Sequence, residues 1–405
     1  MSFWSNWFSR REKKYGSLDL FKEIYGGRTT TSGRTVNWAT ALEVSTVLAC
    51  CKVIAEGIAQ VPWKIFKDTG SDIRNAQAEH PLYRLLYRRP NRWQTSFEFR
   101  ETIAFHLVLK SNAYVFVGRV GSKREIRELV PLEPQFVTVK KLESGDLRYT
   151  YQPIQGQVAV FSSKDIWHIR GPSWNTWQGM DAVTLAREAI SLAMATETTQ
   201  GNMHKNGMQP AGAYSVEGSL SPERYEFLAK WLDKYAMGGE RVGKPMILDM
   251  GAKWLSQQMT GVDAQHLETR RHQIEEICRE FRVMPIMVGF SDKTASYASA
   301  EQMFIAHVVH TLSPWYERLE QSADINLLTE EELNAGFYTK FIPNALMRGA
   351  SKDRAEFYTR AIGSVNATPG WMTTNEIRGL EELPPIVGGD ELFKPQPLAQ
   401  QQGVP

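Results

Sequence analysis

Residues 238–244 have the spacing of a phosphate-binding loop and are the segment most suggestive of an enzyme. They read Gly-Gly-Glu-Arg-Val-Gly-Lys, which fits the pattern G-x-x-x-x-G-K of nucleotide hydrolases. That loop needs a Ser or Thr hydroxyl next, to bind Mg²⁺, and a helix whose amino terminus faces the phosphates. Here Pro245 follows Lys244, and the flanking periodicity predicts a helix before the loop and a strand after it. An exposed turn is the favoured interpretation, and a nucleotide hydrolase that uses Gly238–Lys244 stays open as an alternative.

Two histidines, His307 and His310, lie three residues apart in a segment expected to be helical and could share a metal ion. No Glu or Cys stands at an obvious third position, and two side chains alone make a poor metal site. The sequence also lacks the motifs H-E-x-x-H, C-x-x-C and G-x-S-x-G. We therefore predict no metal, no cofactor and no catalytic residue, and expect that the chain is not an enzyme.

A cluster of basic and aromatic residues lies within residues 83–93 and could bind nucleic acid by stacking and charge. Its members are Tyr83, Arg84, Tyr87, Arg88, Arg89, Arg92 and Trp93. The whole chain has 47 basic and 45 acidic residues, a net charge of +2, whereas tight binding to many phosphates calls for a basic excess. A short helix with a solvated face is favoured, and a monomeric nucleic-acid-binding module is the second alternative.

The composition is that of an ordinary globular protein. The chain has 405 residues, 42% hydrophobic and 23% charged, which is enough for two or three modules with sizeable cores. Its three cysteines are too few for a disulfide framework, and no apolar run approaches the roughly 20 residues that span a bilayer. Residues 1–14 place four aromatic side chains before four basic ones. This pattern favours an arm that docks on a neighbouring subunit, with a membrane-surface helix as the alternative.

Hydrophobic periodicity in the first half of the chain predicts helices followed by antiparallel strands. A helix is expected over 44–60, and Thr95 with Glu98 forms a capping box that opens another. Between residues 112 and 170 the period changes to two, which is typical of strands. Residues 36–178 are therefore expected to form one α+β module.

Two long helices bracket a small insertion in the second half of the chain. Asp181 is expected to cap a helix that continues to residue 206, and Asp263 a second helix to about residue 281. In the insertion, residues 207–262, strands are expected over 213–216, 245–248 and 252–256, and one helix over 222–235. This arrangement is typical of a stalk with a small module at its tip.

The second long helix combines a narrow apolar stripe with charges of both signs. The stripe consists of Leu267, Ile274, Ile277, Cys278 and Phe281. The charged residues expected at an interface between subunits are Glu268, Arg271, Glu275, Glu276, Arg279 and Glu280. Glu275 and Arg279 can pair one turn apart, whereas Glu276 and Glu280 carry like charges. Packing beside copies of the same helix is favoured, and an ordinary surface helix is the alternative.

The segment after this helix is expected to be a polar loop followed by a kinked helix. Pro285 and Gly289 end the long helix, Ser299 and Gln302 form a second capping box, and Pro314 kinks the helix that follows. Other expected elements are a hairpin-like stretch over 63–74, a strand over 337–342, helices over 352–362 and 374–382, and a disordered tail over 384–405.

Short motifs spread over roughly residues 40–392 resemble the HK97-type portal proteins of tailed phages and their prophage relatives. They are Leu42-Glu43-Val44-Ser45, His80-Pro81-Leu82-Tyr83-Arg84-Leu85-Leu86, Arg89-Pro90-Asn91, Ser111-Asn112-Ala113-Tyr114, Leu129-Val130-Pro131-Leu132-Glu133-Pro134, Asp165-Ile166-Trp167-His168-Ile169-Arg170-Gly171, Asp263-Ala264-Gln265, Phe281-Arg282-Val283-Met284-Pro285, Ser299-Ala300-Glu301-Gln302 and Leu312-Ser313-Pro314-Trp315. Each motif is short, and their order and spacing make the resemblance specific. Two departures are Met284, where relatives often carry a second proline, and Ser111, where Gly is common.

The resemblance implies a portal architecture, with an α/β wing, a two-helix stem, a small αβ clip, a tunnel loop with a kinked helix and a short helical crown. The implied divisions are an arm (1–35), the wing (36–178), stem helix 1 (179–206), the clip (207–262), stem helix 2 (263–285), the tunnel loop (286–298), the kinked helix and return to the wing (299–350), the crown (351–383) and the disordered tail (384–405). The residues implied to line the DNA channel are Phe290, Ser291, Asp292, Lys293, Thr294, Ala295, Ser296 and Tyr297.

The resemblance also implies partners and a place in the cell. The chain would form a homo-dodecameric ring at one capsid vertex of the virion, assembled in the host cytoplasm, with no membrane partner. Implied partners are the large subunit of terminase, the major capsid and scaffold proteins, head-completion or adaptor proteins, and double-stranded DNA passing through the channel. In such a ring the terminase supplies the motor, and the portal is a conduit for DNA.

Overall fold

The structure is a computed structural model, and it describes residues 30–68, 76–121, 124–205, 212–215, 221–223, 225–227, 230, 253–256, 262–290, 297–343, 351–363, 370–380 and 384–392. The chain divides into two compact units, Met1–Phe341 and Ile342–Pro405, and each is described by itself. Helices and strands are interspersed along the chain, so the predicted α+β class is confirmed.

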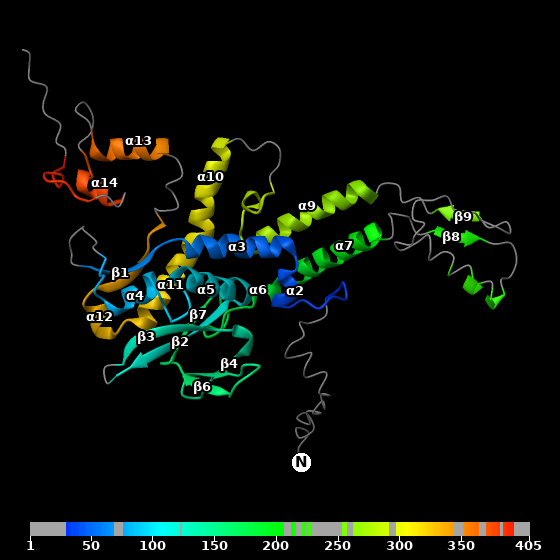
Figure 1. Ribbon diagram of the computed structural model, residues 1–405, viewed down its shortest axis with the longest axis horizontal. Coiled ribbons are helices and arrows are strands. Elements are labelled where there is room, and N and C mark those ends of the chain that lie inside the picture. Colours follow the sequence, from blue (N-terminus) through cyan, green and yellow to red (C-terminus); the bar gives the residue numbers. More distant parts are fainter. Residues whose placement is uncertain are drawn as a thin grey trace, which may run out of the picture. The chain divides into compact units, whose positions relative to one another are not determined.

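The first unit contains most of the regular elements (Figure 1). Its helices are α2 (Trp38–Leu42), α3 (Ser45–Ala59), α4 (Pro81–Tyr87), α5 (Ser96–Lys110), η1 (Pro134–Phe136), α6 (Ala182–Leu185), α7 (Arg187–Lys205), α9 (Val262–Glu280), η2 (Pro285–Val288), α10 (Tyr297–His307), η3 (Val308–Leu312), α11 (Ser313–Leu327) and α12 (Glu330–Asn334). Its strands are β1 (Trp63–Lys67), β2 (Asn112–Val120), β3 (Glu125–Leu132), β4 (Val137–Lys141), β5 (Leu147–Tyr151), β6 (Ala159–Ser162), β7 (Ile166–Arg170), β8 (Gly212–Ser215), β9 (Lys253–Ser256) and β10 (Phe337–Phe341).

The helices α3 and α5 pack against each other in the core of this unit. The helix predicted over 44–60 is α3, and its buried face includes Ile54 and Ile58. The capping box predicted for α5 is also confirmed. The Thr95 side chain accepts a hydrogen bond from the backbone N–H of Glu98, and the Glu98 carboxylate accepts one from the backbone N–H of Thr95.

Arg100 is a buried charge at the centre of this helical core. Its guanidinium donates to the carbonyl of Ala59 at the end of α3 (2.7 Å from Nη2, 3.0 Å from Nε) and to the carbonyl of Leu86 near the end of α4 (3.1 Å). It also donates to Ser96 Oγ at 2.5 Å. A cation at the carboxyl end of a helix offsets the partial negative charge of the helix dipole. Burial lowers the pKa of Arg100 to about 10, so the group stays charged near neutral pH.

Antiparallel strands form two small sheets beside this core, as the period of two predicted. β2 lies between β3 and β7, and a separate sheet has the order β4-β5-β6. A buried cluster of Tyr114, Leu132, Tyr149 and Ile166 joins the two sheets. Residues 36–178 contain both sheets together with α2 to α5 and β1.

β1 pairs with β10, a strand more than 250 residues further along the chain, in the register Trp63↔Phe341 to Lys67↔Phe337. The ring of Trp63 stacks on the ring of Phe341 with centroids 4.6 Å apart. β1 also forms an isolated antiparallel bridge from Phe66 to Ala76. The second half of the hairpin-like stretch predicted over 63–74 lies outside the described residues. The local pattern marked a strand correctly, and tertiary packing chose its partner.

The small insertion contains one antiparallel pair within the described residues, β8 with β9. These correspond to the strands predicted near 213–216 and 252–256. The predicted strand over 245–248 lies outside the described residues, and only fragments of the predicted helix over 222–235 lie within them.

The second unit contains α13 (Ser351–Ile362) and α14 (Thr374–Leu380), close to the two short helices predicted there. Residues 384–392 hydrogen-bond to α14. The Asn375 side chain donates to the carbonyl of Ile386 and to the Asp390 carboxylate, both at 2.9 Å, and Arg378 Nε donates to the carbonyl of Pro384 at 2.8 Å. The prediction of disorder from residue 384 is therefore wrong for 384–392, because polar side chains of α14 supply the anchors that apolar residues do not.

None of the helices in the described part of the chain is long and apolar enough to cross a membrane.

Candidate functional site: the paired long helices and the turn that follows them

The helices α7 and α9 lie side by side (Figure 1). Gln273 on α9 is buried and donates from Nε2 to Thr196 Oγ1 on α7 at 2.9 Å. A buried amide with a partner on the facing helix fixes the axial register of the pair, because sliding would leave it unsatisfied. The two long helices were predicted, whereas the buried Gln273 gave no signal beyond a polar residue at a position flanking the apolar stripe.

The first of these helices was predicted to run without a break from Asp181 to residue 206, but it is interrupted. Asp181 caps the short helix α6 by accepting from the backbone N–H of Thr184 (3.0 Å), and the chain then bends at Ala186 (φ −81°, ψ 4°) before α7 begins. The bend lets α6 pack on α5 while α7 runs with α9. The apolar pattern continues through Ala186, which is buried, so periodicity alone did not mark the break.

The second long helix begins at Val262, so Asp263 is a helical residue rather than the predicted cap. The six charged residues predicted for an interface are placed mainly on the solvent side. Glu268, Arg271, Glu275, Arg279 and Glu280 are exposed, and Glu276 is half-buried. Arg279 forms its ion pair with Glu276, three residues away, and not with Glu275 as predicted. Both spacings lie on one helix face, and the half-buried Glu276 is the nearer partner.

The apolar stripe of α9 packs on α3. Ile277, Cys278 and Phe281 are buried as predicted, and Cys278 Sγ lies 3.9 Å from Cys50 Sγ on α3. The hydrogen bond between the two thiols raises the pKa of Cys50 and lowers the pKa of Cys278. All three cysteines are free and buried.

A tight turn ends α9. Arg282 is in the left-handed region with φ 54°. Its N–H donates to the carbonyl of Arg279 (3.1 Å), and the N–H of Val283 donates to the carbonyl of Cys278 (2.9 Å). This pair of bonds defines a Schellman cap, in which a non-glycine residue at the left-handed position is strained by about 1–2 kcal/mol. Position 282 is occupied by Arg and not by the glycine that usually marks such a cap.

Beyond this cap the predicted tunnel loop, residues 286–298, is helical at both ends. Pro285–Val288 is a 3₁₀ turn, which the fixed φ of Pro285 suits. Gly289 (φ 79°) closes the turn, and the N–H of Phe290 donates to the carbonyl of Pro285 at 3.0 Å.

At the other end of the loop, Tyr297 is the first residue of α10, so Ser299 lies inside the helix and its predicted capping box is wrong. Ala298 and Ala300 are strong helix formers and extend the helix backwards. Ser291, Asp292, Lys293, Thr294, Ala295 and Ser296 lie outside the described residues.

The predicted kink before Pro314 is a π-helical segment, η3, between α10 and α11. Ser313 bridges it, since its N–H and its Oγ (3.0 Å) both donate to the carbonyl of Val308. Proline lacks the N–H that an α-helix would use here, which accounts for the widened turn. Thr311 Oγ1 donates to the carbonyl of Arg282 at 2.6 Å, so η3 holds the cap of α9 in place.

A glycine on α3 allows this junction to close. A Cβ atom at Gly57 would lie 2.8 Å from both δ-carbons of Leu312 on η3. The Gly57 carbonyl accepts a hydrogen bond from Tyr316 Oη at 2.7 Å. Periodicity predicted the helix over 44–60 but did not mark Gly57, because the close approach involves a segment 255 residues away.

The other predicted sites take structural roles or lie outside the described residues. His307 is buried while His310 is exposed, and no group of three metal-binding side chains occurs in the part of the chain described here. In the basic cluster, Arg89 Nε donates to the carbonyl of Asn91 at 3.0 Å, and Asn91 donates to the carbonyl of Leu129 at 2.9 Å. The segment Gly238–Lys244 lies outside the described residues.

Comparison with known proteins gives one consistent group. A family model described as phage portal protein matches residues 45–382. The portal protein of Enterobacteria phage HK97 is 30% identical over 357 residues, which cover 88% of this chain and 82% of that protein.

Solved structures agree. The neck of an empty gene transfer agent (GTA) particle, computed with C6 symmetry, contains a chain with a TM-score of 0.58 and 25% identity, covering 86% of this chain and 93% of that one. The neck of the native GTA particle, computed with C12 symmetry, contains a chain with a similar fold (TM-score 0.56, 24% identity, 86% and 92% covered).

Proposed function

The chain belongs to the phage portal protein family, and we propose that the ring formed by its subunits is the channel through which double-stranded DNA enters and leaves the capsid. The observation that supports this most directly is the family match across residues 45–382, together with a relative in a particle neck of C12 symmetry. A ring of this kind repeats one heterologous interface until it closes. The chain is a structural subunit of the portal.

The paired helices α7 and α9 form the stem in this proposal. The exposed charges of α9 would meet the stem of the next copy, where charges of both signs can pair across the repeated interface. Arg271, Glu275 and Glu280 have no ion pair within the described residues, so they are available to a neighbour. The insertion between the stem helices would be the clip and the second unit the crown.

Residues 290–297 would form the tunnel loop that lines the channel. Asp292 and Lys293 offset each other, and the neighbouring Ser and Thr side chains offer neutral polar contacts. Weak contact suits a conduit, because binding that releases many counterions would hold the DNA and resist sliding. The anchors of this loop support the proposal, since η2 and Thr311 fix the end from which it leaves α9.

We further propose that the clip docks the large subunit of terminase and later the head-completion or adaptor proteins, while the wing meets the major capsid and scaffold proteins. The ring would be assembled in the host cytoplasm and then occupy the portal vertex of the virion. These partners are those of the family. Deletion of residues 216–252 tests the clip assignment, because it should abolish docking of the terminase and adaptor proteins and leave contact with the capsid proteins intact.

Native mass measurement and a packaging assay test the function together. The purified chain should assemble to about twelve times 46.0 kDa. Lys293→Glu should leave this mass unchanged and reduce packaged or retained DNA, because it places a second carboxylate beside Asp292 facing phosphates. Lys293→Arg is the matched control and should package normally. A monomer under all conditions would refute the ring, and normal packaging by Lys293→Glu would refute the loop assignment alone.

A further inference from the structure

We propose that a cavity in the wing receives the aromatic and basic amino-terminal segment, residues 1–14, of a neighbouring copy of this chain. The inference rests on the proposed ring, since a neighbouring copy must be present. Four observations carry it: the cavity and its lining, an unpaired carboxylate at its rim, an unsatisfied nitrogen beside it, and the point from which the arm leaves the described chain.

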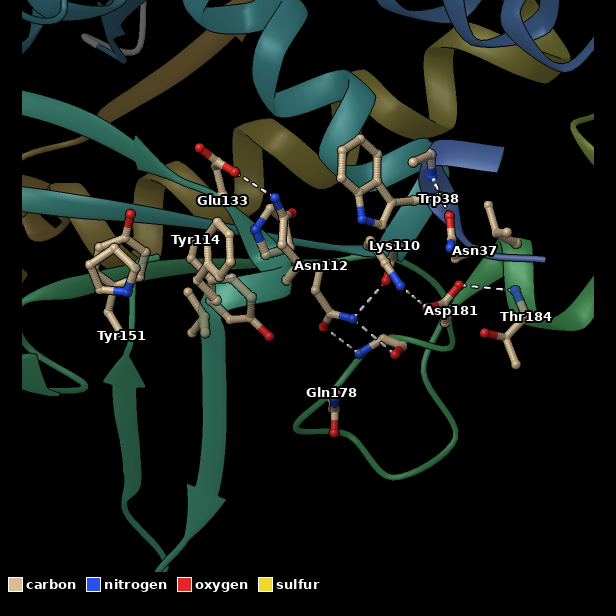
Figure 2. Close-up of a pocket in the computed structure, with 18 of the residues that line it drawn as sticks. Asn37, Trp38, Lys110, Asn112, Tyr114, Glu133, Tyr151, Gln178, Asp181 and Thr184 are labelled. Carbon is tan, nitrogen blue, oxygen red and sulfur yellow. Dashed lines mark hydrogen bonds and ion pairs between the residues drawn. The ribbon is translucent and has the colours of Figure 1, made fainter. Parts of the chain in front are cut away.

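The cavity has a volume of about 1060 Å³ and lies where α2, the start of β2, η1 and the approach to α6 meet (Figure 2). Tyr114 and Tyr151 lie on one side of it, and Trp38 and the ion pair between Lys110 and Asp181 (2.7 Å) on the other. Aromatic and proline side chains alternate with polar groups along its lining. Such a surface suits aromatic side chains that also need polar partners, as Trp does.

The floor of the cavity is held rigidly. Asn112 donates from Nδ2 to the carbonyls of Lys110 (2.8 Å) and Gly179 (3.0 Å) and accepts from the N–H of Gly179 (2.8 Å). A Cβ atom at Gly179 would lie 1.9 Å from the carbonyl oxygen of Ser111, so only glycine fits this approach. A pre-organised floor lowers the entropic cost of receiving a peptide.

Charge favours a basic occupant. Lys110 and Asp181 neutralise each other, which leaves Glu133 as the unbalanced charge among the lining residues. Glu133 is exposed and accepts a hydrogen bond from Gln135 Nε2 at 2.5 Å, and it has no ion pair within the described residues. In residues 1–14, Arg10 and Arg11 follow the last aromatic residue, Phe8, after one serine.

A smaller cavity of about 240 Å³ adjoins the first and shares Trp38, Glu133 and Gln135 with it. His106 lines it, and the buried His106 Nδ1 has no hydrogen-bond partner in the described part of the chain. Burial lowers the pKa of His106 to about 4, so the imidazole is neutral near pH 7. His106 Nδ1 lies beside this cavity but is closed off from it, so it could bond to an incoming indole such as that of Trp4 or Trp7 only after the imidazole turns toward the cavity.

The arm leaves the described chain at α7, and its length allows it to reach a neighbouring copy in the proposed ring. Thr31 donates from its N–H (3.2 Å) and Oγ1 (2.9 Å) to Glu188 on α7, and Ser32 bonds to Ser191 at 3.0 Å. Residues 33–38 then run from α7 to the cavity wall, so the arm leaves the described chain at the start of α7. An arm of 29 residues reaches up to roughly 90–100 Å when extended, far enough for the next copy. In a closed ring, every cavity would then hold one arm.

Photocrosslinking in the assembled ring tests the proposal. A benzophenone side chain replaces Gln135 at the rim of both cavities, in full-length chain mixed during assembly with ¹⁵N-labelled wild-type chain. Irradiation should join the cavity peptide to residues 1–14, with unlabelled-to-labelled pairs present. The same probe at Lys140, exposed on β4 and away from the cavity, should not reach the arm. If both peptides of every crosslinked pair are unlabelled, the arm occupies the cavity of its own copy, which would refute docking on a neighbour. Crosslinks to any other segment would refute residues 1–14 as the occupant.

Charge reversal gives a second readout that does not depend on folding of the core. Glu133→Lys should lower the crosslink yield about twofold to fivefold, the value of an exposed ion pair, while the native mass of the ring is unchanged. Arg10→Glu with Arg11→Glu should restore it. Glu143→Lys, at an exposed glutamate outside the cavity, is the matched control. No change with Glu133→Lys would refute the charge argument.

The remaining outcomes separate this proposal from its alternatives. The wild-type ring should not bind stably to vesicles of phosphatidylglycerol and phosphatidylcholine. If it does bind, and removal of residues 1–14 abolishes the binding, the arm is free to meet membranes and the proposal is overturned. A chain that stays monomeric refutes the ring itself, whereas a ring of the expected mass without arm crosslinks refutes only the docking.

Discussion

Arg100 and the charged face of α9 use the same kinds of side chain in opposite ways. Arg100 is buried and its donors are taken up by the carbonyls of two helix ends and by one hydroxyl. Among the predicted interface charges of α9, all except the half-buried Glu276 are exposed, and only Arg279 and Glu276 pair within the described residues. Buried charges must be satisfied within the subunit to fold at all, whereas exposed and unpaired charges leave their interactions to another molecule. Substitutions in the first region should therefore alter stability, and those in the second should alter assembly.

The largest effect is expected at Arg100. Arg100→Met should lower the free energy of unfolding by about 3–5 kcal/mol, because two buried carbonyls lose their donors and two helix ends lose a compensating charge. Arg100→Lys should recover part of the loss, since an ammonium reaches fewer of these acceptors. Urea unfolding measures the change. Arg92→Met, at an exposed position, is the control and should stay within about 0.5 kcal/mol. Equal changes in the free energy of unfolding for Arg100→Met and Arg92→Met would contradict the expected difference between buried and exposed charges.

Acid should lower the stability of the first unit through His106 on α5. Its folded pKa of about 4 lies below the ordinary value of 6.5, so the unfolded chain binds the proton more readily. Stability is therefore full above pH 6.5 and falls as the pH drops from 6.5 towards 4, by about 1–2 kcal/mol at pH 5 from this group. Unfolding of wild type and His106→Leu should be compared between pH 7.5 and 5. The variant should lose less stability on acidification, and an identical loss would exclude His106 as the cause.

A smaller gain is expected at the end of α9. Arg282→Gly should raise the free energy of unfolding by about 1 kcal/mol or less, because glycine adopts φ 54° without strain but loses more entropy on folding. Arg282→Ala keeps the strain and is the matched control. Thermal unfolding of both variants measures the difference. Destabilisation by glycine beyond that caused by alanine would mean that the Arg282 side chain, and not its backbone, holds the turn.

The smallest effect on stability, and the largest on assembly, is expected on the face of α9. Arg271→Glu should change the free energy of unfolding by less than about 0.5 kcal/mol and reduce the fraction of chain found in rings. Arg127→Glu, at an exposed position on β3, is the control. Native mass spectrometry at a series of protein concentrations gives the ring fraction. Unchanged assembly of Arg271→Glu would remove this residue from the proposed stem interface.

The sequence predicted what depends on neighbouring residues. The capping box of Thr95 and Glu98, the helix over 44–60 and the strands of residues 112–170 are set by local chemistry and periodicity, and all were found. The motifs that resemble portal proteins predicted the family, which the match over 45–382 confirmed.

The sequence did not predict features that depend on distant partners. Three features depend on segments that are distant in the sequence, which hydrophobic periodicity does not report. They are the break at Ala186, the partner of β1 and the close approach at Gly57. The left-handed Arg282 was missed for another reason, since its backbone is held by hydrogen bonds and carries no glycine to mark it. Of the predicted channel residues, only Phe290 and Tyr297 lie within the described structure, at the edges of the loop.

Because its partner is β10, β1 completes its pairing only late in synthesis of the subunit. Trp63 cannot meet Phe341 until the ribosome has made everything between them, including both long helices, α7 and α9. At about 5–20 residues per second, the core strand waits on the order of tens of seconds for its partner. During that time the aromatic surface that Trp63 later shares with Phe341 is open. A chaperone that covers residues 63–67 would protect nascent chains and would leave once β10 pairs with β1.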